Sequence, residues 1–476
     1  MNMQVAKRKK EIRDYMDKLA PQRPAWFSKN RYYYNDLIKF LKYNIPEHST
    51  ILEIGCGTGE LLAGLEPRRG VGIDISAEMI KIAKEKFPDL EFFQMDAENI
   101  TLEEKFEYII ISDTLIYFED IQKAFKELKK VSMPETRIII THHNFLWSPF
   151  LKLAEFLGLK MPQKRLNWLN REDIINSLYL EDFDVIKTGS RFLLPKSFLG
   201  LGYLINRYLA PLPLINKLCL TGYIIARPFS VLDRSNLSSV SVIIPARNEA
   251  GNIENAVKRM PKMGTRTEII FIEGGSPDKT YEEIKRVAEK YRGQWDIKYA
   301  KQDGKGKGDA VRKGFNMAIG DILMILDADL TMPPENLPKF FEAIASNKGE
   351  FINGSRLVYP LEKESMRLLN MIGNKFFSLM FSWLLGQRLK DTLCGTKVIS
   401  KKNYDKLSAN RKYFGEFDPF GDFDLIFGAA KLNLKTVEVP IRYKAREYGE
   451  TNISRFKHGW LLLKMTFFAM NKIKFI

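Results

Sequence analysis

The stretch ILMILDADLT (residues 322–331) joins a run of apolar residues directly to two acids, Asp327 and Asp329. A short apolar run of this kind is typical of a strand buried in a parallel sheet. The two carboxylates would then lie in the loop at the carboxyl end of the strand, which is where open parallel sheets bind their ligands. The stretch therefore predicts an α/β fold with a ligand site beside these acids.

The spacing of the two acids predicts a divalent metal site. Two ionised carboxylates this close repel each other unless a cation lies beside them. Their oxygen atoms suit Mg²⁺ or Mn²⁺, and such ions usually also coordinate substrate phosphates. We therefore expect Asp327 and Asp329 to act in catalysis by holding a metal that offsets the charge of a departing nucleoside diphosphate. The alternative is a pair of loop acids that binds no ligand.

The surrounding sequence repeats an alternation of strand and helix. A buried strand followed by a helix is expected at VSVIIPARNEAGNIENAVKRM (240–260), and further strands are expected at TEIIFIE (267–273) and WDIKYAKQ (295–302). A basic glycine loop with a helix follows at residues 304–320. This alternation predicts a mainly parallel sheet with its ligands at the carboxyl ends of the strands.

Residues 240–455 resemble the family 2 glycosyltransferases of the GT-A fold, especially their dolichol-phosphate mannose synthase-like branch. The segment PARNEAGNI (245–253) is similar to the family motif P-x-x-N-E-x-x-N-I, and the D-x-D pair is intact. The segment EGGS (273–276) departs from the family, which usually has two aspartates before the Gly-Ser, so the nucleobase of the donor stays open. The resemblance implies a nucleotide-sugar donor and a set of substrate-binding residues: Pro245, Arg247, Glu249, Glu273, Lys307, Arg356, Asp391, Lys397 and Arg446. For Arg356 and Arg446, surface arginines in solvent are the alternative.

Two classes of sugar acceptor remain open. A sugar hydroxyl must lose a proton as it attacks, whereas a lipid phosphate is already ionised and needs no base. Asp422 and Asp424 in FGDFDLIF (420–427) are the candidate catalytic bases for a hydroxyl. The resemblance favours a polyprenyl phosphate, and a saccharide hydroxyl, for example on a lipid-linked glycan, is the alternative.

The first half of the chain contains a second site pattern. STILEIGCGTGELLAGL (49–65) predicts a strand, a turn and a helix, and the glycines of the turn allow the backbone to approach a ligand closely. The next three strands are expected to end near Asp74, Asp96 and Ser112, again at the carboxyl edge of a parallel sheet. A glycine turn followed by two strand-end acids, in this order, is a much stronger signal than the turn alone.

Residues 30–230 resemble the class I S-adenosylmethionine-dependent methyltransferases. The segment EIGCGTG (53–59) matches the first motif of that family, E-x-G-C-G-T-G. The resemblance implies S-adenosylmethionine as the methyl donor, with Asp74 holding its ribose and Asp96 facing its adenine. The runner-up is a nicotinamide-binding Rossmann domain, which expects G-x-G-x-x-G where this chain has Glu60. The expected cofactor-binding residues are Glu53, Gly55, Gly57, Gly59, Asp74, Asp96 and Ser112.

The methyl acceptor needs few groups from the protein. The sulfonium is already activated, so alignment and exclusion of water supply most of the rate. A base is required only if the acceptor loses a proton, and His142 and His143 follow the fifth strand, where an acceptor is expected. Tyr117 and Asp113 are equal candidates, and a structural histidine pair is the alternative.

The composition supports two domains and an anionic partner. A chain of 476 residues exceeds one ordinary core, and its net charge of +16 favours phosphates or an acidic membrane surface. The three cysteines lack CxxC spacing, which indicates a reducing compartment rather than a zinc site or disulfides. We expect domains at residues 1–230 and 240–455, joined by a linker at 231–239 and followed by an apolar, basic helix at 456–476.

Two apolar segments flanked by Lys or Arg suggest contact with a membrane. They are KFFSLMFSWLLG (375–386) and WLLLKMTFFAM (460–470), and neither is long enough to span a bilayer. Buried core helices and interfacial helices on an anionic membrane are the two interpretations, and the net charge favours the second. No nucleic-acid-binding module is recognised, so nucleic acid is not an expected partner, and the oligomeric state stays open.

These patterns predict a cytoplasmic, bifunctional transferase that moves a methyl group and a sugar and associates peripherally with a membrane. The start of the chain has basic residues but no apolar core of a signal peptide, which favours the cytoplasm. The competing class is a binding or scaffold protein that keeps one or both folds without turnover, which the altered EGGS segment favours. The sugar, both acceptors and the order of the two steps stay open.

Overall fold

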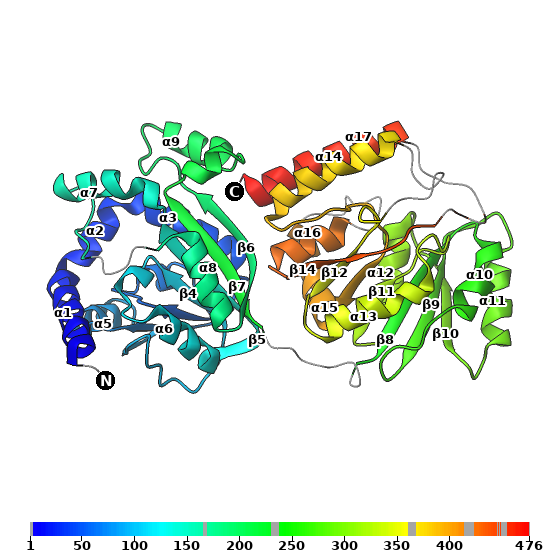
Figure 1. Cartoon of the computed structure of the whole chain (residues 1–476), viewed down its shortest axis with the longest axis horizontal. Helices are drawn as coiled ribbons and strands as arrows, with labels where there is room; N and C mark the ends of the chain where they lie inside the picture. The colour runs from blue at the N-terminus through cyan, green and yellow to red at the C-terminus, as the bar shows by residue number, and fades with distance from the viewer. Residues whose placement is uncertain are drawn as a thin grey trace. The chain divides into compact units, whose positions relative to one another are not determined.

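The chain forms two compact units. The computed structural model describes the backbone of residues 3–164, 169–229, 238–359, 368–413, 423–444, 446, 448 and 455–475. One unit covers residues 1–230 and the other residues 231–474, and each is built on a seven-stranded mixed sheet (Figure 1). The prediction of an α/β protein with two domains, each built on its own sheet, is confirmed. Most of the predicted linker, residues 231–237, lies outside the described residues.

The first sheet has the strand order β3-β2-β1-β4-β5-β7-β6. Strands β1 to β5 are parallel, and β7 runs antiparallel to both β5 and β6. The expectation of a mainly parallel sheet is therefore right for five strands, and the antiparallel pair forms one edge. The strands are β1 (Thr50–Ile54), β2 (Arg69–Asp74), β3 (Glu91–Gln94), β4 (Phe106–Ser112), β5 (Ser132–His143), β6 (Phe183–Arg191) and β7 (Thr221–Pro228).

Three helices precede the first strand, and the third of them packs on the sheet. Its buried residues Leu37, Phe40 and Leu41 belong to the same hydrophobic cluster as Ile51 of β1 and Ile110 of β4.

The helices of this unit are α1 (Met3–Leu19), α2 (Arg23–Lys29), α3 (Arg31–Asn44), α4 (Glu60–Ala63), α5 (Ala77–Lys86), α6 (Ile121–Leu128), α7 (Ser148–Phe156), α8 (Arg171–Leu180) and α9 (Leu201–Leu204).

The second sheet has the order β10-β9-β8-β11-β13-β12-β14, with β13 antiparallel to its neighbours β11 and β12. Its strands are β8 (Val240–Ala246), β9 (Thr267–Glu273), β10 (Asp296–Lys301), β11 (Ile322–Ile325), β12 (Phe351–Ser355), β13 (Lys397–Ser400) and β14 (Thr436–Pro440). Its helices are α10 (Ile253–Lys258), α11 (Thr280–Lys290), α12 (Lys307–Met317), α13 (Leu337–Ala345), α14 (Leu368–Leu385), α15 (Lys401–Ala409), α16 (Phe423–Lys431) and α17 (Arg455–Ala469).

The stretch 322–331 occupies the centre of this second sheet. Strand β11 lies between β8 and β13, and its four residues are all buried. Because β11 is parallel to β8 and β8 is parallel to β9, the loops that follow these three strands emerge at the same edge of the sheet. Asp327 and Asp329 follow the end of β11 at that edge, together with the loops that carry Glu249 and Glu273.

The two apolar segments predicted at residues 375–386 and 460–470 form parts of α14 and α17, which pack against each other (Figure 1). Both helices also present large apolar side chains to solvent, among them Phe376, Leu379, Trp460 and Phe467. Among the described residues, no helix combines the length and the apolar character that crossing a bilayer requires.

Candidate functional sites

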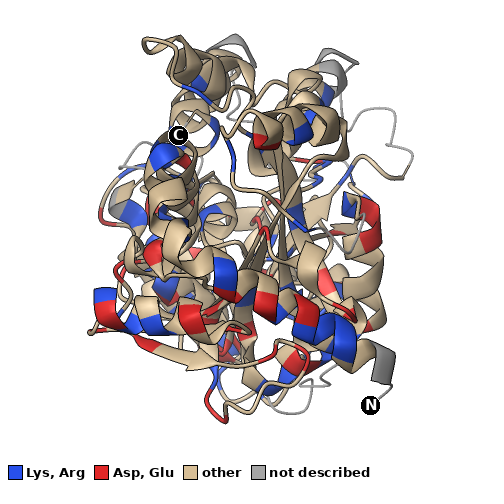
Figure 2. Ribbon diagram, turned by 90° about the vertical axis from the view of Figure 1, so that its left-hand side faces the viewer, with Lys and Arg blue, Asp and Glu red and all other residues tan. Residues whose placement is uncertain are grey.

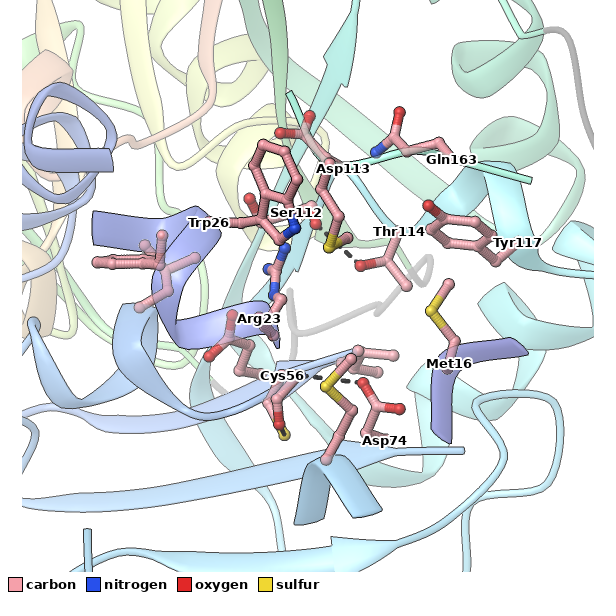
Figure 3. Close-up of a pocket in the computed structure, with 18 of the residues that line it drawn as sticks. Met16, Arg23, Trp26, Cys56, Asp74, Ser112, Asp113, Thr114, Tyr117 and Gln163 are labelled. Atoms are coloured by element: carbon pink, nitrogen blue, oxygen red, sulfur yellow. Dashed lines mark hydrogen bonds between the residues drawn. The ribbon is translucent and has the colours of Figure 1, made fainter. Parts of the chain in front are cut away.

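A cavity of about 330 Å³ lies at the carboxyl ends of β1, β2 and β4 in the first unit (Figure 3). Gly59 does not line it, and a Cβ at that position would lie 2.8 Å from the ring of Phe92, so close packing requires this glycine. The other predicted cofactor-binding residues all line the cavity: Glu53, Gly55, Gly57, Asp74, Asp96 and Ser112.

The glycine turn and the first strand-end acid are held together by backbone hydrogen bonds. Gly55 has a φ of +74°, and a Cβ there would lie 2.3 Å from the side chain of Thr114. The N–H of Gly57 donates to Asp74 Oδ2 at 2.9 Å, and the N–H of Ser76 donates to Asp74 Oδ1 at 2.9 Å. Burial raises the pKa of Asp74 above its usual value, although these backbone hydrogen bonds oppose the shift.

The second strand-end acid is paired with the N-terminal helix. Lys9 of α1 places its Nζ 2.6 Å from Asp96 Oδ2 and 2.6 Å from Glu98 Oε2. Both Lys9 and Asp96 line the cavity, so α1 forms one of its walls. No local sequence pattern indicates this pairing, because Lys9 lies 87 residues before Asp96.

Arg23 is a cavity residue that the sequence motifs do not reveal. It comes from α2 and lies between Trp26 and Asp74 in the view of the cavity (Figure 3). Its Nε is only 3.3 Å from where a Cβ of Gly57 would stand, so the guanidinium lies against the glycine turn. The only local hint in the sequence is chemical: an arginine that starts a helix before Pro24.

Glu53 lines this cavity and has a buried carboxyl oxygen without a partner among the described residues. The residue is 2% exposed, and its Oε2 has no hydrogen-bond partner among the described residues. Burial raises the pKa of Glu53 to about 8, and the charge of Arg23 only partly offsets this. An unsatisfied carboxyl group and a guanidinium that line the same cavity suit a ligand with both a cationic and an anionic group.

The cavity extends to a polar cluster at the ends of β4 and β5. The hydroxyl of Tyr33 donates to Asp113 Oδ2 at 2.8 Å, and His143 Nε2 lies 3.8 Å from the same oxygen. Asp113, Tyr117 and His143 line the cavity, as does Tyr33, which no sequence pattern indicated. His142 does not line it: its ring is buried beside Gly222 of β7, and this burial lowers its pKa.

In the second unit the two acids of the D-x-D motif each face a cation. Lys307 Nζ lies 2.6 Å from Asp327 Oδ1, and Arg446 Nη2 lies 2.7 Å from Asp329 Oδ2. Burial acts to raise the pKa of Asp327, but the nearby charges of Lys307, Lys397 and Arg356 hold it below its usual value. Asp327 is therefore ionised at neutral pH, ready to act as an oxygen ligand or an ion-pair partner.

Arg446 joins the D-x-D motif to the first motif of the second unit. Its Nη1 donates to Glu249 Oε1 at 2.9 Å, while its Nη2 donates to Asp329 Oδ2. Asn252 donates to the other oxygen of Glu249 at 2.7 Å. The structure thus brings together three predicted site residues that are as much as 197 residues apart in sequence.

Other predicted residues of this unit are buried in pairs. Arg356 donates to Asp391 through two nitrogens, at 2.7 and 2.8 Å, and the Asp391 side chain is fully buried. Burial opposes ionisation of Asp391, but the charge of Arg356 lowers the pKa to about 2. Lys397 is also fully buried, and its Nζ donates to the carbonyl oxygen of Cys394. Arg356, which the resemblance marks as substrate-binding, directs its fork of nitrogens at Asp391 in this structure.

The remaining predicted residues lie at or near the strand ends. Glu273 is buried at the end of β9, where its carboxylate accepts a hydrogen bond from the N–H of Ser276. Arg247 packs against the loop after β9, since a Cβ on Gly274 would lie 3.2 Å from the Cβ of Arg247. Pro245, the second-last residue of β8, is paired in register with Ile272 of β9.

Of the two candidate bases, the structure describes only Asp424. Asp424 lies on α16, where its Oδ2 accepts from Arg411 Nε at 2.8 Å. Asp422 lies outside the described residues. The structure therefore gives Asp424 an ion-pair partner within its own part of the fold.

The donor set of the D-x-D motif suits a metal that is shared with a substrate. Among the described residues, no group of three or more His, Cys, Asp or Glu side chains is arranged to hold a metal. Asp327 and Asp329 supply hard oxygen ligands, which fit Mg²⁺ or Mn²⁺ when further oxygens come from a diphosphate or water. Lys307 and Arg446, which face these acids, are the cations available for such a diphosphate.

Both halves of the chain match known families. Residues 51–135 match the family described as "Methyltransferase domain", and residues 241–407 match "Glycosyl transferase family 2". The first of these supports the Rossmann-like fold of the N-terminal unit, and the second supports the glycosyltransferase fold of the C-terminal unit.

Among curated proteins, the dolichol-phosphate mannosyltransferase of Pyrococcus furiosus is 32% identical over 219 residues, which are 45% of this chain and 59% of that protein. The UDP-N-acetylglucosamine–dolichyl-phosphate N-acetylglucosaminyltransferase of Methanococcus voltae is 27% identical over 245 residues, or 48% of this chain and 96% of that protein. A solved structure from Thermotoga maritima, a methyltransferase described as a possible histamine N-methyltransferase, has 18% identity and a TM-score of 0.37, and covers 46% of this chain and 99% of its own.

Proposed function

We propose that this chain, which joins a methyltransferase domain to a family 2 glycosyltransferase domain, is a bifunctional transferase. One half would move a methyl group from S-adenosylmethionine, and the other would move a sugar from a nucleotide donor to a polyprenyl phosphate or a lipid-linked glycan. The observation that carries the proposal is that each sheet gathers acids and cations at the carboxyl ends of its strands. In both units these are the residues that the two family motifs mark, joined by Arg23 in the first unit and Arg446 in the second.

The first cavity offers a partner for each polar part of S-adenosylmethionine. The guanidinium of Arg23 suits the carboxylate of the methionine end, and the unsatisfied Glu53 carboxyl suits its ammonium. Asp74 and Asp96 are available for the ribose hydroxyls and the adenine. Bound in this way, the donor would be aligned by residues of β1, β2 and the N-terminal helices, which is the main requirement of methyl transfer.

The methyl acceptor would lie beside Asp113, Tyr33 and His143. The hydrogen bond between Tyr33 and Asp113 fixes the carboxylate, and His143 is within 3.8 Å of it. If the acceptor must lose a proton, a carboxylate and an imidazole at this end of the cavity are the groups positioned to take it.

Replacing Arg23 with Ala is expected to weaken the binding of S-adenosylmethionine by about 1–3 kcal/mol, the scale of leaving a buried charged group without its partner. Asp74→Ala is expected to have an effect of similar size, because the ribose hydroxyls lose their acceptor. Calorimetric titration of the full chain measures both. Arg31→Ala is a matched control, since Arg31 is exposed at the start of α3 and outside the cavity. A folded Arg23→Ala variant with unchanged affinity would remove Arg23 from the donor site.

In the second unit, Lys307 and Arg446 would hold the diphosphate of the nucleotide sugar beside Asp327 and Asp329. A divalent metal bound by the two acids would offset the charge that develops on the leaving diphosphate. The pairs seen here, Lys307 with Asp327 and Arg446 with Asp329, hold the cations beside the acids before any donor arrives.

The acceptor class of the sugar can be tested at Asp424. We propose a polyprenyl phosphate, so Asp424→Asn is expected to reduce transfer only modestly, because an ionised phosphate needs no base. A saccharide hydroxyl would instead need one, and its loss typically reduces the rate by about 10²–10⁴-fold. The rate is measured with a defined acceptor that the protein uses, beside Asp422→Asn and the exposed control Asp405→Asn. A loss on the larger scale, with donor binding intact, would favour the hydroxyl.

The second unit would work at a membrane surface. The exposed apolar side chains of α14 and α17, such as Leu379 and Trp460, and the net charge of +16 are the features that support a peripheral contact with anionic lipid. Such a contact would bring a lipid-linked acceptor to the soluble sugar donor.

A further inference from the structure

Two segments of the first unit expose an unusual number of large apolar side chains. We call residues 145–159 and 198–218 the rim. Of the 29 large hydrophobic side chains that are exposed among the described residues, sixteen lie in these 36 residues. Single exposed apolar residues are normal on a protein surface, but a concentration of this kind marks a binding surface.

The rim borders the methyl-donor cavity. Leu151 and Leu159, from the first segment and its helix α7, line the cavity, and so do Pro195 and Lys196, which lead into the second segment. Hydrogen bonds join the two segments at their bases, from Trp147 Nε1 to the carbonyl oxygen of Leu218 at 2.8 Å and from Asn144 Nδ2 to that of Lys217 at 2.9 Å. The rim is therefore one surface, formed by α7 and the α9 region.

Helix α7 has its apolar side facing outward. Phe150, Leu153 and Leu157 follow the spacing of one helix face, and all three are more than half exposed. Leu151, on another face, is the residue that packs inward, beside Phe192 and Leu220. A surface helix of a globular protein normally has the reverse arrangement, so the outward face of α7 is suited to an apolar environment. In the second segment, Leu199 is fully exposed and Leu214 is 80% exposed.

The charges around the rim indicate which apolar environment it suits. Residues 144–160 and 193–219 contain five Lys or Arg and a single acid, Glu155, which pairs with Lys160 at 3.0 Å. In the side view, α7 and α9 lie at the upper edge, where the coloured residues are sparse, while α1 below them is striped with charges of both signs (Figure 2). A second copy of the rim would carry the same positive charge and be repelled, whereas anionic lipid headgroups would attract it.

We propose that the rim is a lipid-binding surface that docks the first unit on an anionic bilayer, with the methyl-donor cavity opening toward the lipid. Apolar side chains enter the boundary between headgroups and acyl chains, and flanking Lys and Arg side chains meet the headgroups. The methyl acceptor is then a group carried on a lipid, an inference that rests on the proposed methyl transfer.

The test places a reporter on the rim of the full chain. Cys56, Cys219 and Cys394 are all buried, so a cysteine introduced as Leu199→Cys can be labelled selectively with an environment-sensitive nitrobenzoxadiazole dye. We expect its emission to shift to the blue and rise several-fold when vesicles of phosphatidylglycerol and phosphatidylcholine are added at low salt. The response should fall with added salt, because attraction between charges is screened. The matched control is Tyr179→Cys, at an exposed position on α8 outside the rim, which should respond little.

Three results would overturn the lipid-binding rim. The first is a label that does not respond although the protein sediments with the vesicles, since the bilayer would then be held elsewhere. The second is a response without lipid that grows with protein concentration, which would show a second copy on the rim. The third is a blue-shifted dye emission, typical of an apolar environment, that is already present in dilute protein without lipid.

The acceptor and the methyl transfer are tested separately. With S-adenosylmethionine labelled on its methyl group and membranes of the source cells, we expect the label in the lipid extract, and label found only in water-soluble products would overturn the lipid-borne acceptor. Failure of the chain to bind S-adenosylmethionine in calorimetry would instead contradict the proposed methyl transfer. The dye experiment would still decide the nature of the rim, because it does not depend on turnover.

Discussion

Replacing Asp329 with Asn should reduce sugar transfer by about a thousandfold or more, while S-adenosylmethionine binding stays unchanged. The reason is that Asp329 is one of two carboxylates available to a divalent metal, whose stabilisation of a leaving diphosphate amounts to several kcal/mol. The same carboxylate pairs with Arg446 at 2.7 Å, so the variant would also release the cation that we propose for the diphosphate. The two units have separate hydrophobic cores, which is why the methyl-donor site should not respond.

The measurement is the rate of release of nucleoside diphosphate with and without acceptor, at saturating Mg²⁺ or Mn²⁺. Asp303→Asn is the matched control, because this exposed acid of the same unit pairs with Lys313 and not with the D-x-D motif. Full activity of Asp329→Asn, or full activity of the unchanged protein in excess chelator, would end the metal interpretation of Asp327 and Asp329.

Replacing Arg356 with Ala is expected to lower the free energy of unfolding of the second unit by about 3–5 kcal/mol. The variant would leave the carboxylate of Asp391 buried without the fork of hydrogen bonds that it now accepts. Hydrogen exchange of the amides in β12 and β13 under native conditions reports this loss locally. Arg292→Ala is the control, since the Arg292–Glu289 pair is largely exposed and should contribute less than about 1 kcal/mol. An equal effect of the two variants would contradict a structural role for the buried pair.

The same pair predicts a dependence of stability on acid. Arg356 holds the pKa of Asp391 at about 2, below the value of about 3.9 expected for an unfolded aspartate. A depressed pKa in the folded state gives stability that is present at neutral pH and is lost as the pH falls through about 4 toward 2. Asp391→Asn should flatten this part of the profile of unfolding free energy against pH. If the unfolding free energy falls as steeply with acid in the variant as in the unchanged protein, the acid sensitivity belongs to other carboxylates.

The sequence predicted those parts of the two sites that are local in the chain. The glycine turn with Asp74, and strand β11 with Asp327 and Asp329, are readable because strand pattern and functional residues lie side by side. Arg446 is different: it meets Glu249 and Asp329 across 197 and 117 residues, and no short pattern encodes such a distance. The sheets also differ from a simple parallel order, since β7 and β13 run antiparallel to their neighbours and nothing in their composition sets their direction.

The partners of single charged residues could not be predicted from the sequence. Arg356 is paired with Asp391, which follows 35 residues later and has a fully buried side chain. An acid on an apolar helix suits a base, yet Asp424 is paired with Arg411. In both cases the partner is fixed only when the chain has folded.

Arg23 and Lys9 also limit how this protein can be divided. The match to the methyltransferase domain begins at residue 51, after both of them. A fragment cut at that boundary would retain the glycine turn and Asp74. It would lose the guanidinium beside that turn, the lysine that binds Asp96, and the Tyr33 hydroxyl that holds Asp113. Any transplant of this pocket into another protein would therefore have to carry residues 3–44 together with the sheet.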